Sequence, residues 1–429
     1  MKKIYIAIVL ILASLLIAPK FIGSMVETER QRVLAKLNET DGITLTTSQY
    51  TGGWFGADVV SEMKIALKDN SINEVTIIVE EDLSFGPVII TEQNWHLGLG
   101  YSRVKFKFTA LELDESIVDI INEKLHVGAL LSFSKEVTTF INTDKISYQD
   151  VDSVIVSEPS SAQFTLINNE HISGDFSWGG LDVKGQDERL VIGAVGMSTK
   201  QKIVSGDYLA GTAILTGNAT FTVAGLNVYN DNSKVFSVDG AALTSEVSLE
   251  NDLLALALNY QAKEISASGQ YFKEPNVAIL LANIDVHALQ ELNTTMANLS
   301  VNASGQYDSE ESLKALSAVA EKILAKDPNL KITDLSVVTD EGKIASEFNF
   351  NINKDLFDSA DLNSMALIKA LEADAKGKAP MAFLSKLGMA PMVDNFVKEG
   401  YLNRQDNDIT VEAKYVQSQL TVNGKAFQL

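Results

Sequence analysis

The feature that most constrains the fold is a hydrophobic alternation of period two that recurs along the chain. Val104, Phe106 and Phe108 are separated by polar residues, and the same alternation returns around Phe221 and Phe350. Successive side chains of a strand point to opposite faces of its sheet, so this pattern is typical of strands with one buried face. We therefore expect strands throughout the region that follows the N-terminal segment.

Helical spacing of apolar residues is concentrated nearer the C-terminus. It predicts a helix over residues 309–326 and further helices over 115–125, 286–299, 360–375 and 381–399. Together, the two patterns predict an α+β fold: an extended, largely antiparallel sheet with a helix-rich C-terminal third, behind an N-terminal membrane-anchor helix.

A Ser-Gly-polar-aromatic pattern recurs in the middle of the chain. It occupies Ser173–Phe176, Ser205–Tyr208, Ser268–Tyr271 and Ser304–Tyr307. Spacing of this kind predicts a serial antiparallel sheet, although strand-rich chains also reuse Gly-Ser turns by chance.

The N-terminus carries Lys2 and Lys3 before an apolar run from Ile4 to Ala18. This pattern is typical of a secretory signal peptide, but the segment up to Ile22 approaches the length of a membrane-spanning helix. Poor residues at the possible cleavage sites favour an uncleaved anchor, which the following positions would define: Ile4, Leu10, Leu16 and Ile22.

The lysines orient the segment, because positive charge is retained on the cytoplasmic side. We therefore expect a bacterial inner-membrane protein that crosses once, with a cytoplasmic N-terminus and a periplasmic body. The expected parts are an anchor or uncleaved signal (1–24), a helical stalk (25–42), a repetitive antiparallel β-rich region (43–307) and a helix-rich α+β region (308–429).

Composition narrows the class of partner. The chain has no cysteine and a formal net charge of −21. An exported chain without cysteine has no disulfide framework and fits the bacterial envelope, whereas the negative charge disfavours nucleic acid and the surface of anionic membranes.

Motifs for catalysis are absent from the sequence. The histidines are isolated, and no phosphate-binding loop, dinucleotide fingerprint or nucleophile elbow occurs. We predict no catalytic, cofactor-binding or metal-binding residue and no cofactor, although pairs among the many carboxylates leave an enzyme as a third possibility.

Three short motifs carry a resemblance to a known family. They are Tyr50-Thr51-Gly52-Gly53-Trp54-Phe55, Gly86-Pro87, and the ending that contains Asn423-Gly424. In this order, behind an apolar N-terminal segment, they resemble the YdgA-like proteins of bacterial envelopes, which carry domain of unknown function 945. The resemblance implies inner-membrane attachment, a periplasmic body and self-association, and it brings no known reaction.

The same residues also have a structural interpretation. Gly53 beside Trp54 and Phe55 fits a strand bend covered by aromatic rings, and Asn423-Gly424 fits a tight turn.

We therefore expect a non-enzymatic binding or scaffolding protein of the envelope. The expected partners are the inner membrane through the N-terminal helix, a second copy of the chain, and a lipid or another envelope protein. In the alternative, an open sheet face binds or transfers lipid or another apolar ligand. Exposure of Phe221, Val223, Val247, Leu249 and Leu256 would favour that alternative.

Overall fold

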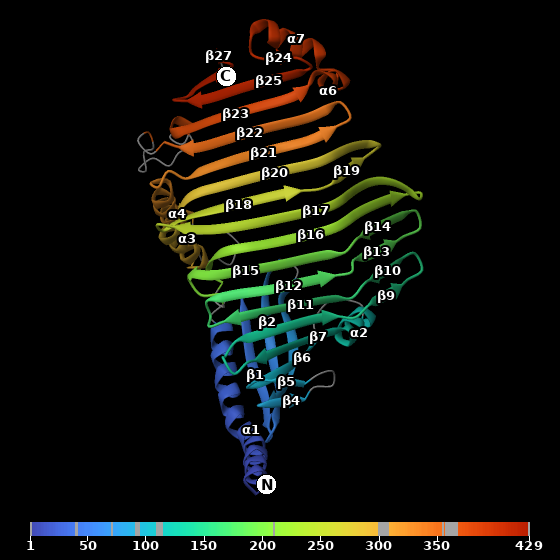
Figure 1. Cartoon of the computed structure of the whole chain (residues 1–429), viewed down its shortest axis with the longest axis vertical. Coiled ribbons are helices and arrows are strands. Elements are labelled where there is room, and N and C mark those ends of the chain that lie inside the picture. The colour runs from blue at the N-terminus through green and yellow to red at the C-terminus, as the bar shows by residue number, and fades with distance from the viewer. Residues whose placement is uncertain are drawn as a thin grey trace. The chain divides into compact units, whose positions relative to one another are not determined.

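The computed structural model describes residues 2–38, 42–69, 72–90, 95–108, 115–208, 211–298, 309–353, 356 and 368–427. The chain divides into two compact units. Figure 1 labels their helices and strands. Unit 1 comprises residues 1–148, 156–179 and 198–213, and unit 2 comprises residues 149–155, 180–197 and 214–429.

Unit 1 is an antiparallel sheet with one long helix packed on it. Its strands pair in the order β1-β2-β3-β6-β7-β8-β11-β12. Its elements are α1 (Lys2–Leu37), β1 (Ile43–Gly52), β2 (Gly56–Asp69), β3 (Ile72–Phe85), β4 (Val88–Ile90), β5 (Trp95–Leu97), β6 (Gly100–Phe108), α2 (Glu115–Lys124), β7 (Leu125–Leu131), β8 (Val137–Thr143), β11 (Ser160–Ile167) and β12 (His171–Trp178). Three further strands contribute residues to both units: β9 (Ile146–Gln149), β10 (Val154–Ser157) and β15 (Val195–Ser205).

Helix α1 packs its apolar side chains on the sheet of unit 1. Ile22 joins a buried cluster with Val59, Leu83 and Phe85. The approach is close, because a Cβ placed on Gly23 would lie 2.7 Å from the ring of Phe85. Residues 25–37, which belong to the predicted stalk, form the C-terminal third of this helix.

The predicted fold included a membrane-anchor helix, and this part of the prediction is wrong. Among the described residues, no helix is both long enough and apolar enough to cross a membrane. Pro19 and Lys20 lie within α1, and from Ile22 onward only one side of the helix is buried, with Ile22 and Leu34 on it.

Unit 2 is a broad antiparallel sheet whose strands follow one another mostly in chain order. They pair as β13-β14-β16-β17-β18-β20-β21-β22-β23-β25-β26-β27, with β19 beside β17 and β20, and β24 beside β25. The strands are β13 (Leu181–Lys184), β14 (Glu188–Ile192), β16 (Ile214–Asn230), β17 (Ser233–Glu250), β18 (Leu253–Gln261), β19 (Glu264–Ala267), β20 (Gln270–Asp285), β21 (Asn329–Thr339), β22 (Gly342–Ile352), β23 (Leu371–Pro380), β24 (Asn403–Gln405), β25 (Asp408–Val416), β26 (Gln419–Val422) and β27 (Lys425–Phe427).

The prediction of a helix-rich C-terminal third is also wrong. Helices are scattered along the chain: α3 (Val286–Asn298), α4 (Ser309–Leu324), α6 (Met381–Lys386) and α7 (Ala390–Glu399). Strands β21, β22 and β23 occupy much of the region between α4 and α6. Of the helix predicted over residues 360–375, residues 360–367 lie outside the described residues and 368–370 are helical. Residues 371–375 belong to β23, whose Ala, Glu and Lys residues favour helix in isolation. Pairing with β22 and β25 on both sides overrides that preference.

The Ser-Gly-polar-aromatic segments occupy different structural positions. Gly174 lies within β12, Gly206 follows β15 in the left-handed region, and Gly269 forms the turn between β19 and β20. The segment at Ser304–Tyr307 lies outside the described residues. The three described segments therefore do not mark equivalent points of a repeating unit.

Candidate binding site on an open sheet face

One face of the sheet in unit 2 is apolar across many strands. The register aligns one row of side chains on this face from strand to strand: Val247, Leu256, Leu281, Leu330, Phe350, Ala373, Tyr415 and Leu420. A second row, two residues away, contains Ala219, Ser245, Leu258, Ile279, Ile332, Phe348, Ala375, Ala413 and Val422. We call these two rows the apolar face.

Phe221, Leu243 and Tyr260 continue the apolar face toward its margin, because they lie two residues beyond the second row. The rings of Phe348 and Phe350 stack at a centroid distance of 6.3 Å, as expected for two side chains on the same side of one strand. The face is therefore a continuous surface built from side chains far apart in the sequence.

The apolar face is partly accessible to solvent. In the two rows Leu330 is exposed and the other members are half-buried, and at the margin Phe221 and Tyr260 are 40% and 44% exposed. The five positions chosen from the sequence (Phe221, Val223, Val247, Leu249 and Leu256) lie on this face, and each is exposed or half-buried. Among the described residues of unit 2, the fully buried apolar side chains lie in helices or at strand ends, as Leu254, Val286 and Val319 do.

The opposite face of the same sheet is mostly polar, although Ala257 and Leu280 also lie on it. The row that alternates with the apolar rows includes Asn218, Glu246, Lys331, Asn349 and Lys414. A shallow groove of about 430 Å³ crosses this side, with Thr220, Thr244 and Asn259 in its lining. The two faces of one sheet thus differ in chemistry, since successive residues of each strand point to opposite sides.

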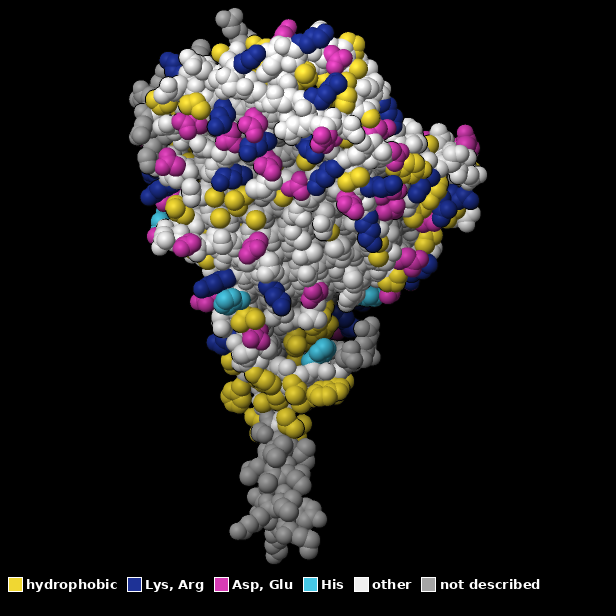
Figure 2. Space-filling model, turned by 45° about the horizontal axis from the view of Figure 1, so that its top comes forward, with side chains coloured by type: hydrophobic (Ala, Val, Ile, Leu, Met, Phe, Trp, Pro, Cys, Tyr) yellow, Lys and Arg dark blue, Asp and Glu magenta, His cyan; other side chains and the backbone are white. Residues whose placement is uncertain are grey.

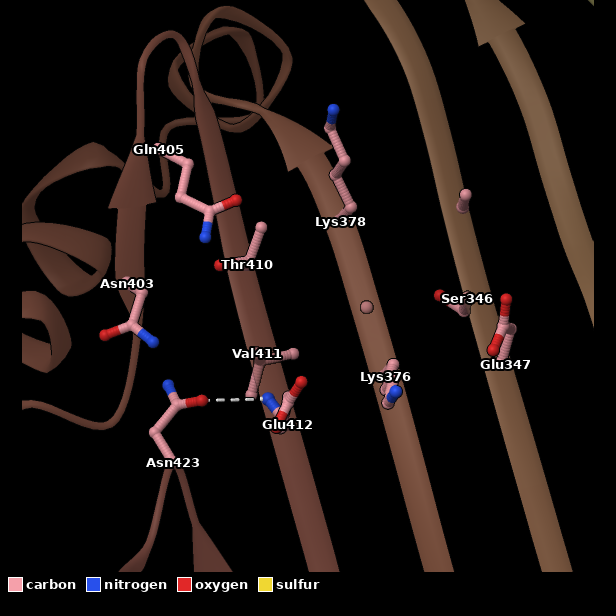
Figure 3. Close-up of a pocket in the computed structure, with 12 residues that line it drawn as sticks. Ser346, Glu347, Lys376, Lys378, Asn403, Gln405, Thr410, Val411, Glu412 and Asn423 are labelled. Carbon is pink, nitrogen blue, oxygen red and sulfur yellow. Dashed lines mark hydrogen bonds between the residues drawn. The ribbon is translucent and has the colours of Figure 1, made fainter.

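A second groove, of about 510 Å³, lies on the polar side toward the C-terminal strands (Figure 3). Glu347, Lys376 and Glu412 occupy directly opposed positions on β22, β23 and β25, so their charges alternate across the strands. Lys378 lies 2.7 Å from the carboxylate of Asp408. Opposed charges of this kind offset one another, which suits a solvated sheet surface.

Asn423 fixes one border of this groove. Its Oδ1 accepts a hydrogen bond from the backbone N–H of Glu412 at 3.0 Å, drawn in Figure 3, and its Nδ2 donates to the Tyr401 carbonyl at 2.9 Å. Asn423 and Gly424 form the tight turn between β26 and β27, both with positive φ, 47° and 78°. The motif at the end of the chain therefore has a structural role in unit 2.

The motif residues from the first part of the chain come together in unit 1. Tyr50 packs beside the cluster of Ile22 and Phe85. Gly53 donates its backbone N–H to the carbonyl of Gly56 in the turn between β1 and β2. Trp54 donates its indole N–H to the carbonyl of Leu16 in α1 at 2.7 Å.

Phe55 and Gly86-Pro87 complete that arrangement. The carbonyl of Phe55 accepts a hydrogen bond from the N–H of Phe85, which precedes Gly86. The Gly86-Pro87 peptide bond is cis and leads into β4. Of the predicted anchor positions, Ile22 is buried, Leu16 is exposed, and the side chains of Ile4 and Leu10 lie outside the described residues.

Sequence reasoning missed a buried ion pair. The guanidinium of Arg30 on α1 donates from Nε to both carboxylate oxygens of Glu81 at 3.0 and 3.1 Å, and also to the hydroxyls of Thr47 and Ser61. The two residues are 51 positions apart, and both stand among other charged residues. No pattern in the sequence distinguishes them from solvated neighbours.

No metal centre emerges from the described part of the chain, where no group of three or more His, Asp or Glu side chains could hold an ion. The ring of His96 stacks on Tyr101 at 5.3 Å, and His126 lies 3.2 Å from Asp144. These histidines thus make packing and surface contacts.

The fold and its surfaces define a β-sheet protein with a broad open apolar face. The chain belongs to the family described as bacterial protein of unknown function (DUF945), whose family model matches residues 1–429. The resemblance to YdgA-like proteins is thereby confirmed. No curated protein and no solved structure matches the chain.

Proposed function

We propose that this protein is a non-enzymatic binding protein of the bacterial envelope that holds lipid or another apolar ligand on the apolar face of unit 2. The observation that carries this proposal is the continuity of the two apolar rows from β17 to β26, in which no side chain is fully buried. Monomeric soluble proteins seldom expose apolar patches larger than a few hundred Å², and larger patches mark interaction sites.

Hydrocarbon suits this surface better than a polar ligand does. The side chains of the two rows are almost all aliphatic or aromatic, and Ser245 and the hydroxyl of Tyr415 are their polar groups. Burial of apolar surface contributes about 25 cal/mol per Å², so even partial coverage of the face by acyl chains would be favourable.

The location belongs to the same proposal. Lys2, Lys3 and the apolar run that follows favour export, and membership in a bacterial family fits an envelope compartment. We place the body on the periplasmic side of the inner membrane, where phospholipids are at hand.

Site-specific photo-crosslinking tests the ligand directly. Leu330 and Lys331 are consecutive residues of β21, both exposed, with side chains on opposite faces of the sheet. A photo-reactive amino acid would replace either residue in the full-length protein in bacterial cells. After irradiation, mass spectrometry of the purified protein would identify the adducts.

We expect lipid adducts at position 330 and far fewer at position 331. Adducts of a second copy of this chain, or of one other envelope protein, at position 330 would overturn lipid binding in favour of scaffolding. The same yield of lipid at both positions would also overturn the proposal, because it would reflect non-specific labelling.

A further inference from the structure

Unit 1 carries exposed apolar side chains at one end of its sheet. The register places three connections at that end: the turn after Gly52, the segment between Phe85 and Gly100, and the turn after Leu131. Backbone hydrogen bonds join them, from Phe85 N–H to the Phe55 carbonyl and from Leu99 N–H to the Leu131 carbonyl. Helix α1 passes the same end, where Trp54 bonds to Leu16.

The exposed side chains on these segments form what we call the apolar collar: Leu16, Phe21, Trp54, Phe55, Ile90 and Trp95. Figure 2 shows hydrophobic side chains in a continuous band across the lower end of the described surface. The collar belongs to unit 1 and the apolar face to unit 2, so an inference from the collar is independent of the function proposed for the apolar face.

The hairpin of β4 and β5 has an outer side that is apolar throughout. Ile90 pairs with Trp95, and these side chains are 81% and 67% exposed. Val88 and Leu97, the other outward pair, are exposed as well. The inward positions differ, because Ile89 is fully buried and His96 stacks on Tyr101. Such exposure on a short hairpin is not needed for its own folding.

In the turn that carries Trp54 and Phe55, described polar groups are hydrogen-bonded within the protein. The indole N–H of Trp54 bonds to a helix carbonyl, and the turn that holds it is closed by the bond from Gly53 to Gly56. The backbone of Phe55 bonds to Phe85. A surface that enters hydrocarbon needs this arrangement, because no water is available there for unpaired backbone groups.

Basic side chains flank the collar. Lys20 precedes Phe21 on α1, and Lys135 lies in the turn that carries the exposed Phe133; both lysines are exposed. Lysines can extend their amines to lipid headgroups while their stems stay in apolar surroundings. Tryptophan likewise favours the boundary between hydrocarbon and water.

We propose that the apolar collar inserts into the interfacial layer of a phospholipid bilayer and so docks unit 1 on the membrane surface. A bilayer fits better than a protein partner, because the collar is assembled from separate segments beside α1 and a fluid layer needs no shape complementarity. In the sequence, the apolar run Ile4 to Ala18 leads directly into this part of α1. Docking through the collar would localise contact despite the net charge of −21, which repels the rest of the protein from anionic lipid.

The test uses full-length protein in vesicles of phosphatidylethanolamine and phosphatidylglycerol with brominated acyl chains. The sequence has 3 tryptophans, so each can be kept alone by changing the others to Phe. Trp178 is the matched control. The register through Ser160 and Thr143 to Leu125 places it at the opposite end of the strands from Leu131.

We expect emission from Trp54 and Trp95 to shift to the blue and to be quenched by the brominated chains, while Trp178 is not quenched. Vesicle-bound protein in which Trp54 and Trp95 escape quenching would overturn the proposal. A blue shift without quenching would also overturn it and would indicate a protein partner or a second copy instead.

A second measurement covers the case in which a tryptophan variant fails to fold. The chain has no cysteine, so Ile90→Cys can carry one polarity-sensitive fluorophore, with Asp144→Cys at the opposite strand end as its control. Only the label at position 90 should report an apolar environment on vesicle binding. Equal responses from the two labels would contradict docking through the collar.

Discussion

Arg30 of α1 and Glu81 of β3 form an ion pair in which the side chains are only 9% and 13% exposed. Thr47 and Ser61 accept further hydrogen bonds from the guanidinium, so all three of its nitrogens have partners on the sheet. The pair joins the helix to the sheet of unit 1 at a fixed position along its axis. Removal of either partner would leave the other charge buried without compensation.

Arg30→Met should therefore destabilise unit 1 by about 3 kcal/mol. Hydrogen exchange of the β3 amides measures this, because local opening is observed without the assumption that the whole chain unfolds in one step. Asp82→Asn, one residue along the same strand, is the control: Asp82 pairs with Arg103 at an exposed site and should contribute about 0–1 kcal/mol. Equal effects of the two changes would contradict the assigned role.

Gly86→Ala should displace the β4–β5 hairpin that carries Ile90 and Trp95 of the collar. A Cβ on Gly86 would lie 1.7 Å from the backbone oxygen of Gly98, which cannot move independently of the hairpin. We expect a loss of about 1–3 kcal/mol, measured as faster hydrogen exchange at Ile89 and His96. Gly185→Ala is the control substitution, because a Cβ on Gly185 would lie 3.5 Å from the nearest atom, the backbone oxygen of Glu188, which is an ordinary van der Waals distance.

The stability of unit 1 should fall in alkaline solution through Tyr50. Burial raises the pKa of the Tyr50 phenol above its usual 10.0, the negative charge of Glu27 raises it further, and Arg30 lowers it. The folded state thus prefers the protonated phenol. The stabilisation of the folded state that this preference gives is fully present below the pKa of the unfolded chain, and it is lost as the pH rises through the pKa of the folded protein.

Unfolding of the native protein and of Tyr50→Phe, followed across pH 10 by circular dichroism, checks this expectation. The variant should lose less stability between neutral and alkaline solution than the native chain loses. An unchanged dependence on pH would show that the phenol is not involved.

Asn423→Ala should loosen the border of the groove in Figure 3. The change removes an exposed hydrogen bond from the Glu412 N–H and a part-buried one to the Tyr401 carbonyl, and we expect a loss of about 0.5–1.5 kcal/mol. Asn423→Asp keeps the acceptor for Glu412 and loses the donor to Tyr401, so it should fall between the native protein and the alanine variant. Protection of the Glu412 amide from hydrogen exchange is the measurement.

Period-two alternation predicted the sheet well wherever one side of a strand is apolar. The segments around Phe221 and Phe350 form β16 and β22, as that pattern requires. The same reasoning failed for β23, because its small apolar residues Ala373 and Ala375 give a weak alternation among residues that favour helix.

The sequence suggested that the sheet has an open apolar face, but it could not show how many strands that face crosses. Leu281 and Leu330 become neighbours only through the pairing of β20 with β21, and no local pattern reports pairing between segments separated by α3 and α4. The collar was missed for a related reason. Trp54 and Trp95 are single residues in short connections, and only the fold brings them to one end of a sheet.

The dimensions of the apolar face set a limit on how it can be occupied. Its rows cross β17, β18, β20, β21, β22, β23, β25 and β26, which at about 4.8 Å between strands extends over roughly 34 Å. One leaflet of a bilayer contributes about 15 Å of hydrocarbon, half of the ~30 Å core. The surface is thus long enough for more than one acyl chain in succession. Several lipid molecules would therefore bind to each protein, and binding would not saturate at one lipid per protein.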